Sequence, residues 1–264
     1  MPYSVNDLVT SYQACGVKAG HVVYLTGNFG RLGVSLDVSK VELFERHLQA
    51  LWQILGEQGT IVVPTHSASI CNTDQIFDLA LTKSEMGPFS EYVRLLEGSV
   101  RSFHPFFSRT AIGAKAEYIC GHNSRHSYGG HTPFSRMLEL DALFISVGIE
   151  PRQIVSLVHQ CELEMGVPYR YNKEFMHQVI RDGRVSVEPF YHLVTYLDCD
   201  IVRDKNIKIF EHFKQQHKLH QVSMGKGTCW AFNMKSFYQS TTELMSQDIY
   251  SWLQTPPTKR PYQN

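Results

Sequence analysis

The sequence predicts an α/β fold in which a central mixed sheet is flanked by helices and the C-terminal part is more irregular. Short apolar runs rich in valine and isoleucine alternate along the chain with segments whose apolar residues recur at helical spacing. Strands that alternate with helices favour a sheet covered on both faces. The 264 residues contain no internal repeat and no low-complexity linker, so we expect a single domain over residues 1–264.

The first strand, helix and strand unit lies near the N-terminus. The apolar run at 21–25 predicts a strand that leads into a glycine-rich loop at 26–33. Residues 41–55 predict a helix that glycines end before a second strand at 60–64. A unit of this length suits a parallel crossover.

Later elements follow around a histidine-, glycine- and proline-rich stretch at 121–133, a composition typical of functional loops. Apolar runs predict strands before and after it, at 111–113 and 143–148. The other expected elements are a helix, a second helix, a strand, an amphipathic helix and a frayed, proline-rich tail, at 89–96, 154–165, 186–195, 202–219 and 256–264.

Composition and charge restrict the classes of function. The 25 Lys and Arg balance the 25 Asp and Glu, so the chain lacks the cationic excess that nucleic acids or anionic membranes require. No segment reaches the roughly 18 apolar residues of a spanning helix, and the N-terminus lacks a signal-peptide pattern. We therefore expect a cytoplasmic protein with a small-molecule partner, and the sequence leaves its oligomeric state open, a homodimer included.

Cysteine and histidine spacing gives no metal motif. The six cysteines occur singly without a C-x-x-C pair, which indicates reduced thiols. Two groups among the 13 histidines are closely spaced, but neither matches a catalytic zinc motif: His122, His126 and His131, and His212, His217 and His220. We expect no metal, and we interpret the Gly225-Lys226-Gly227 segment as a turn.

Six segments share a specific order and spacing. In chain order they read YLTGNFGRLG, GTIVVPTHS, SEMGPFSEYVR, VRSFHPFFSRTAIG, YGGHTPFSRMLELDALFISVGI and SLVHQCELEMGVPYR, and the similarity spans Val22 to about Phe190. Together they resemble the antibiotic acetyltransferase family, whose name-giving members are the aminoglycoside 3-N-acetyltransferases. The resemblance implies transfer of an acetyl group from acetyl-CoA to the amine of an amino sugar.

The resemblance also suggests which residues carry the chemistry. His159 matches the family's catalytic histidine in sequence context. Because an ammonium ion cannot attack a thioester, an imidazole is the natural group to accept its proton. Glu162 stands three residues later on the same helical face and either orients the imidazole, binds the amine or is a solvated glutamate. His192 is a second candidate partner of the imidazole, and a purely structural role explains it equally well.

Two segments are candidates for cofactor binding. The glycine-rich loop permits close backbone approach to the pantetheine chain, and its arginine can meet a phosphate; its residues are Thr26, Gly27, Asn28, Phe29, Gly30 and Arg31. The second segment has family counterparts that flank the pantetheine and thioester, and its candidates are Ser102, Phe103, His104 and Ser108. Its phenylalanines also suit a core position.

Three segments depart from the family pattern. Thr26-Gly27-Asn28-Phe29 replaces His-Ser-Ser-Leu, Pro64-Thr65-His66-Ser67 replaces Pro-Thr-Phe-Thr, and Phe190-Tyr191-His192-Leu193 replaces an acidic cluster. Since acidic residues bind polycationic aminoglycosides, the last change favours a biosynthetic amino sugar over an aminoglycoside as acceptor. His66 and Tyr191 are candidate contacts to that acceptor.

Three alternative hypotheses have a basis in the sequence. Cys161 suggests an acyl-enzyme, but positions i and i+2 of a helix point apart, so His159 is poorly placed to deprotonate it. The His159 and Glu162 pair also suits a thioester or amide hydrolase, and the altered first loop suits a noncatalytic relative that binds CoA or a sugar.

Overall fold

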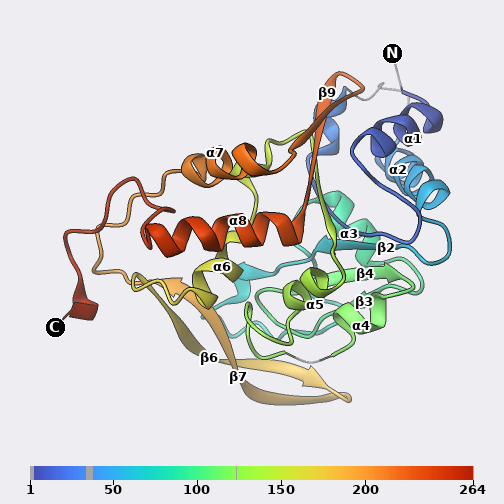
Figure 1. The fold of residues 1–264 in the computed structure, drawn as a ribbon. Helices are drawn as coiled ribbons and strands as arrows, with labels where there is room; N and C mark the ends of the chain where they lie inside the picture. Colours follow the sequence, from blue (N-terminus) through green and yellow to red (C-terminus); the bar gives the residue numbers. More distant parts are fainter. Residues whose placement is uncertain (1–2, 34–37, 123, 264) are drawn as a thin grey trace.

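A seven-stranded mixed sheet forms the centre of the molecule in the computed structural model, which describes residues 3–33, 38–122 and 124–263 (Figure 1). Its strands are β1 (Val22–Gly27), β2 (Thr60–Pro64), β3 (Val100–Arg101), β4 (Arg109–Gly113), β5 (Leu143–Val147), β8 (His220–Met224) and β9 (Gly227–Asn233). They lie in the order β3-β4-β2-β1-β5-β9-β8. The strands β2, β1 and β5 are parallel, whereas β4 and β9 pair antiparallel on either side of them. The predicted α/β fold with a central mixed sheet is confirmed.

Helices cover both faces of the sheet. Successive residues of β1 point to opposite faces, so Val22 and Tyr24 belong to one apolar core while Val23 and Leu25 belong to the other. The first core is completed by α4 (Ala116–Cys120), α5 (Pro133–Glu139), α6 (Val158–Glu164), α7 (Ile207–Gln216) and α8 (Met234–Gln247). The second is completed by α1 (Val5–Ala14), α2 (Lys40–Leu55) and α3 (Pro88–Arg94).

A long two-stranded hairpin extends beside the main sheet (Figure 1). It is formed by β6 (Arg170–Arg181) and β7 (Arg184–Thr195), which pair antiparallel over their whole length. A third apolar cluster, which includes Phe77, Phe103 and Phe106, packs against its inner residues Phe175 and Phe190. The sequence predicted the second strand of this hairpin but not the first.

Two predicted helices are shorter than expected. The segment 154–165 begins irregularly, and α6 starts only at Val158 after a short 3-10 helix over Pro151–Gln153. The segment 202–219 becomes helical only at Ile207, because Lys205 and Asn206 both adopt a left-handed backbone with φ of 61°. A left-handed residue cannot continue a right-handed helix, so α7 starts after them.

The C-terminal part contains more regular structure than the sequence predicted. The expected turn at 225–227 is the tight turn between β8 and β9, which extend the central sheet. The tail expected to be frayed is tied to the body, because Asp200 accepts hydrogen bonds from Thr258 Oγ1 at 2.7 Å and Lys259 N at 2.9 Å. Residue 264 lies outside the described residues.

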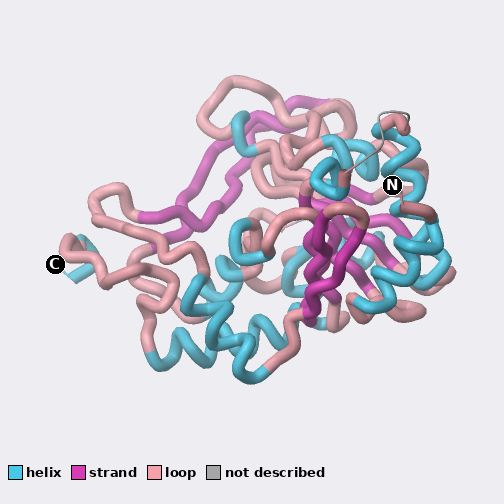
Figure 2. The backbone as a smooth tube through the Cα atoms, turned by 90° about the horizontal axis from the view of Figure 1, so that it is seen from above, coloured by secondary structure: helices cyan, strands magenta, loops and turns pink. Residues whose placement is uncertain are grey.

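The two ends of the chain lie on opposite sides of the molecule (Figure 2). The C-terminal end follows α8 and packs near the hairpin side, whereas α1 lies against α2 at the other end. Within the described ranges, no helix has the length and apolar character needed to cross a bilayer.

The carboxyl ends of the three parallel strands create the place for a site. The chain leaves β1 toward β2 on one side, while β5 lies on the other, so the order of strands reverses direction between β1 and β5. Ligands of open α/β sheets bind at this kind of switch point. The backbones that follow β1 and β5 approach each other closely at this point. A Cβ on Gly27 would lie 2.1 Å from the Val147 carbonyl oxygen, and a Cβ on Gly148 would lie 2.4 Å from the Asn28 carbonyl oxygen, so both positions require glycine.

Candidate active site

A cavity of about 580 Å³ opens at the carboxyl edge of the parallel strands, and we name it the central cavity. The end of β1 contributes Thr26 and Gly27, and the segment after β2 contributes His66. Ile149 follows β5, and His159 projects from α6. Residues far apart in sequence therefore meet around one space because three strands end at the same edge.

A second cavity of about 760 Å³ adjoins the first, and we name it the loop cavity. The two cavities share Thr26, Gly27, Met86 and Ile149 as wall residues. The rest of the loop cavity is mainly apolar and is formed by the glycine-rich loop, α2 and the start of α3, with Asn28, Phe29, Gly30, Lys40, Leu43, Phe44 and Phe89 among its wall. The predicted cofactor loop therefore borders both cavities.

The His159 ring is held on three sides. Its Nδ1 lies 2.5 Å from Glu162 Oε2, and the rings of Tyr128 and Trp252 pack edge-on against it at centroid distances of 5.7 and 5.5 Å. The side chain is 23% exposed and borders the central cavity. Since Nδ1 is occupied and Nε2 makes no hydrogen bond to any described residue, Nε2 is the nitrogen available to a ligand.

Glu162 is fully buried, and three side chains contact its carboxylate. Besides His159, its carboxylate accepts a hydrogen bond from the Tyr169 hydroxyl at 2.9 Å and lies 2.8 Å from Arg170 Nε. The Arg170 side chain is 5% exposed. A buried carboxylate needs a cation to compensate for lost solvation, and Arg170 supplies it. The alternative that Glu162 is a solvated surface glutamate is therefore wrong.

These contacts set the charge states at neutral pH. Burial lowers the pKa of His159 below its ordinary 6.5, although the Glu162 carboxylate opposes the shift. Burial alone would raise the pKa of Glu162, but His159 and Arg170 outweigh it and the net pKa lies below 4.5. At pH 7 the pair is thus a neutral imidazole beside a carboxylate, the state that a base requires.

Two further imidazoles border the central cavity. His66 stacks on Phe107 at a centroid distance of 3.9 Å, and His192 packs against the same ring at 5.1 Å. Burial lowers both pKa values, that of His192 to about 4. His66 Nε2 and His192 Nδ1 are buried without a hydrogen-bond partner. Both side chains are therefore neutral, and they leave polar atoms unpaired next to the cavity. His192 makes no hydrogen bond to His159.

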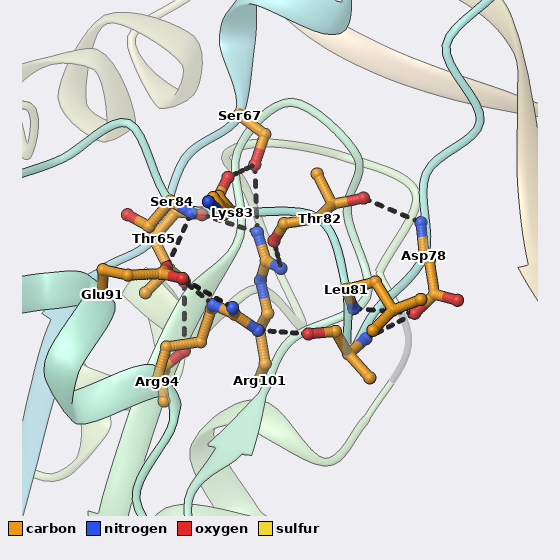
Figure 3. Close-up of polar contacts among 12 residues, drawn as sticks. Thr65, Ser67, Asp78, Leu81, Thr82, Lys83, Ser84, Glu91, Arg94 and Arg101 are labelled. Carbon is orange, nitrogen blue, oxygen red and sulfur yellow. Dashed lines mark hydrogen bonds and ion pairs between the residues drawn. The ribbon is translucent and has the colours of Figure 1, made fainter.

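The segment that carries His66 into the cavity is anchored by a buried arginine (Figure 3). The Arg101 guanidinium donates to the carbonyl oxygens of Thr65 at 2.9 Å and Thr82 at 2.5 Å, and to Ser67 Oγ at 3.0 Å. Burial lowers the pKa of Arg101 to about 10, which still leaves it charged at pH 7. One side chain thus joins both ends of the irregular segment between β2 and α3.

Replacing Arg101 by methionine is expected to lower the free energy of unfolding by about 3 kcal/mol, because hydrogen bonds from a charged donor contribute about 1.5–3 kcal/mol each. Urea unfolding measures the change. Arg46→Met is the matched control, since Arg46 pairs with Glu42 on the outside of α2 with its side chain 31% exposed. That variant should change stability by no more than about 0.5 kcal/mol. Equal losses in both variants would contradict the anchoring role.

The four candidates of the second predicted cofactor segment line neither the central cavity nor the loop cavity. Ser108 Oγ donates to the Thr65 carbonyl oxygen at 2.7 Å, and Ser102 Oγ accepts from Arg109 N at 2.9 Å. His104 Nδ1 accepts from Phe107 N at 3.1 Å, and Phe103 belongs to the cluster under the hairpin. These four side chains, predicted to contact the cofactor, are buried in the interior behind the residues that line the central cavity. Their sequence neighbour Phe107 is the residue that reaches the cavity.

Two other candidates also lie away from the cavities. The Tyr191 hydroxyl donates to Glu174 Oε2 at 2.7 Å on the outside of the hairpin, so its predicted contact with the acceptor is not supported. The Arg31 guanidinium donates to the Gly148 carbonyl oxygen at 3.3 Å and closes the loop onto β5. Its side chain therefore has a structural partner already.

Several residues of the site were not predicted from the sequence. Tyr169 and Arg170 lie at the end of the sequence segment that contains His159. Their roles follow from the burial of Glu162, which only the structure shows. Tyr128 comes from the glycine-rich stretch at 121–133, which is pinned to α6 because Gly129 N donates to Gln160 Oε1 at 2.8 Å.

The site contains no cluster suited to a metal and no activated thiol within the residues described. No group of three or more His, Cys, Asp or Glu side chains is arranged to bind a metal ion in residues 3–33, 38–122 and 124–263. Cys161 is buried, its Sγ points to the Leu157 carbonyl oxygen at 3.6 Å, and burial raises its pKa. A thiol in this setting stays protonated and unreactive.

Comparison with known proteins reveals similarity over most of the chain. The sequence pattern of the family described as aminoglycoside 3-N-acetyltransferase matches residues 37–246. Aminoglycoside N(3)-acetyltransferase III of Pseudomonas aeruginosa is 23% identical to this chain over 273 aligned residues, which cover 97% of this chain and 95% of that relative.

Solved structures share the fold. AAC-IIIb in its binary complex with CoASH matches with a TM-score of 0.80 at 16% identity, over 97% of this chain and 100% of that one. AAC-VIa bound to sisomicin matches with a TM-score of 0.78 at 19% identity, over 94% and 98%. The YokD protein from Bacillus subtilis matches with a TM-score of 0.78 at 16% identity, over 94% and 95%.

Proposed function

The chain belongs to the aminoglycoside 3-N-acetyltransferase family and is an acyltransferase that uses acetyl-CoA, and from this premise we propose that it acetylates an amine of an amino sugar with His159 as the general base. The resemblance drawn from the six segments is thereby confirmed at the level of the family. The His159 and Glu162 pair at the wall of the central cavity is the observation that supports the proposed base.

The proton path follows from the geometry of the pair. The acceptor nitrogen attacks the thioester carbonyl carbon and passes its proton to Nε2 of His159, the nitrogen that no described residue occupies. Glu162, at 2.5 Å from Nδ1, stabilises the imidazolium that forms. When the carbon–sulfur bond breaks, the same imidazolium returns the proton to the leaving thiolate, so that an amide and a free thiol are produced and the enzyme is unchanged.

The loop cavity is the proposed site for CoA. Its wall combines the backbone of the glycine-rich loop with apolar side chains of α2 and α3, a surface suited to the pantetheine chain. Thr26 borders both cavities, and no described residue forms a hydrogen bond with its hydroxyl. We place the thioester at this shared wall, where the Thr26 hydroxyl is free to donate to the developing oxyanion.

Gly30→Leu is expected to weaken CoA binding about tenfold or more, because a side chain at this position enters the loop cavity. A Cβ at Gly30 would meet only Asn28 Oδ1, at 3.2 Å, so the change requires a small shift of that one side chain. Isothermal titration calorimetry with CoA measures the effect. Gly130→Leu is the control, because a Cβ there meets nothing within 4 Å and the residue lines neither cavity. An unchanged affinity for CoA in Gly30→Leu would contradict the placement of CoA in the loop cavity.

The acceptor class is tested by thiol release from acetyl-CoA across a panel of amino sugars, sugar nucleotides and aminoglycosides. We expect release to depend on an added amine. Release that is equally fast without any amine would indicate the hydrolase alternative, and saturable CoA binding without any release would indicate the noncatalytic one. AAC-VIa, which shares the fold, is known bound to sisomicin, so aminoglycosides belong in the panel.

A further inference from the structure

A third cavity, of about 630 Å³, adjoins the central cavity, and we name it the outer cavity. The two share Ile154, Ser156, His159 and Arg203 as wall residues. A ligand whose amine lies at His159 can therefore extend into the outer cavity. The loop cavity does not share a wall residue with it.

The wall of the outer cavity is positively charged. Arg152, Arg203 and Lys205 line it, and no Asp or Glu among the described residues does. Arg152 is compensated by Glu150, whose Oε2 lies 2.8 Å from its Nε. Arg203 and Lys205 have no carboxylate partner in the described part of the chain. Arg203 instead lies over the Trp252 ring, 5.0 Å from its centroid, which orients the guanidinium without neutralising it.

The backbone keeps these cations at the wall. Asp204 stands between them but turns inward, where its Oδ2 accepts a hydrogen bond from Lys208 N at 2.9 Å in the first turn of α7. Lys205 has a φ of 61°, which lysine rarely adopts. Strained positions of this kind persist where the surrounding structure fixes them, and they cluster at binding sites.

A buried oxygen in the same wall is unpaired. Asn206 is 8% exposed, and its Nδ2 donates to the Arg152 carbonyl oxygen at 2.7 Å. Its Oδ1 has no hydrogen-bond partner although it is buried. Leaving a buried acceptor unpaired is energetically costly. The outer cavity thus combines two uncompensated cations with a buried, unpaired oxygen beside them.

We propose that the outer cavity binds a phosphate or diphosphate group carried by the amino-sugar acceptor, with Arg203 and Lys205 as its ligands. The proposal rests on the proposed function, because it takes the amine at His159 as its starting point. A guanidinium binds phosphate oxygens through parallel hydrogen bonds, and the lysine adds a point charge. A polycationic acceptor meets repulsion from the same two residues, so this wall selects for anionic amino sugars.

The test compares matched acceptors. Amino-sugar phosphates are assayed against their unphosphorylated counterparts, with the amine at different ring positions, by thiol release from acetyl-CoA. We expect the phosphorylated member of the accepted pair to have a kcat/KM about tenfold higher or more. Arg203→Glu and Lys205→Glu should reduce or reverse that ratio, mainly through KM. Arg184→Glu, an equal charge reversal at the exposed turn of the hairpin, should leave the ratio as in the wild type.

A binding measurement separates this proposal from the proposed function. Pyrophosphate titrated into the enzyme should bind, and Arg203→Glu and Lys205→Glu should weaken that binding about tenfold while Arg184→Glu does not. Equal kcat/KM for both members of every pair, or equal pyrophosphate binding in all variants, overturns the proposal. Loss of CoA affinity in Arg203→Glu also overturns it, because the cavity would then bind the phosphates of CoA. If no amine accelerates thiol release, the proposed function fails and the acceptor assignment falls with it, whatever the pyrophosphate result.

Discussion

Replacing His159 with alanine is expected to lower kcat by about a hundredfold or more while the affinity for CoA changes little. The variant removes the acceptor for the amine proton, but it leaves the loop cavity, which His159 does not border, intact. Steady-state thiol release and CoA calorimetry measure the two quantities. His126→Ala is the control, because His126 stacks on Tyr191 at the surface of the hairpin and lines no cavity described above.

The pH profile gives a second readout of the same residue. Because burial lowers the pKa of His159, the imidazole is the free base above its ordinary value of 6.5 and becomes protonated only at lower pH. The acid limb of kcat should therefore lie below pH 6.5 and should disappear in His159→Ala. An alanine variant with wild-type activity at neutral pH contradicts the role of general base.

The parallel centre of the fold could be predicted from the sequence because its signals are local. The strands at 60–64 and 143–148 are continuous apolar runs, as expected for strands buried on both faces. The helix predicted at 41–55 is found over Lys40–Leu55, where Ser39 Oγ accepts from Glu42 N at 3.1 Å and caps the first turn. Each of these elements is specified by its own residues.

The hairpin was only half predicted, because its first strand depends on tertiary packing. In β6, four consecutive residues from Tyr171 to Glu174 are exposed, and burial alternates only from Phe175 onward. Such a segment has no strand signal until the aromatic cluster that includes Phe103 lies beneath it. Nonlocal contacts of this kind cannot be read from apolar spacing.

The site was predictable where a motif marked it and not where burial decided the outcome. His159 was singled out from its segment, and it borders the central cavity as a base must. Ser108 and Phe107 are neighbours in one motif, yet the first faces Arg101 in the interior and the second faces the cavity. Sequence alone does not say which side of a turn points inward. The role of His159 itself remains a prediction until the variants are measured.

Glu162→Gln is expected to reduce kcat by roughly a hundredfold and to lower the free energy of unfolding by about 3 kcal/mol. Glutamine keeps the shape but removes the anion that stabilises the imidazolium and compensates the buried Arg170, whose Nε lies 2.8 Å from Glu162 Oε2. Glu211→Gln is the matched control, since Glu211 is exposed on α7 and lines none of the three cavities. Thiol-release kinetics and urea unfolding of both variants provide the measurements.

The dependence on pH distinguishes loss of a charge from a packing defect. The fold lowers the pKa of Glu162 below 4.5, so the stability that its carboxylate contributes is fully present above pH 4.5 and is lost as the pH falls through the lowered value. The gap in unfolding free energy between the wild type and Glu162→Gln should therefore be constant near neutrality and shrink in acid. A gap of the same size at every pH would assign the destabilisation to packing, and a variant with full activity would remove Glu162 from the proposed mechanism.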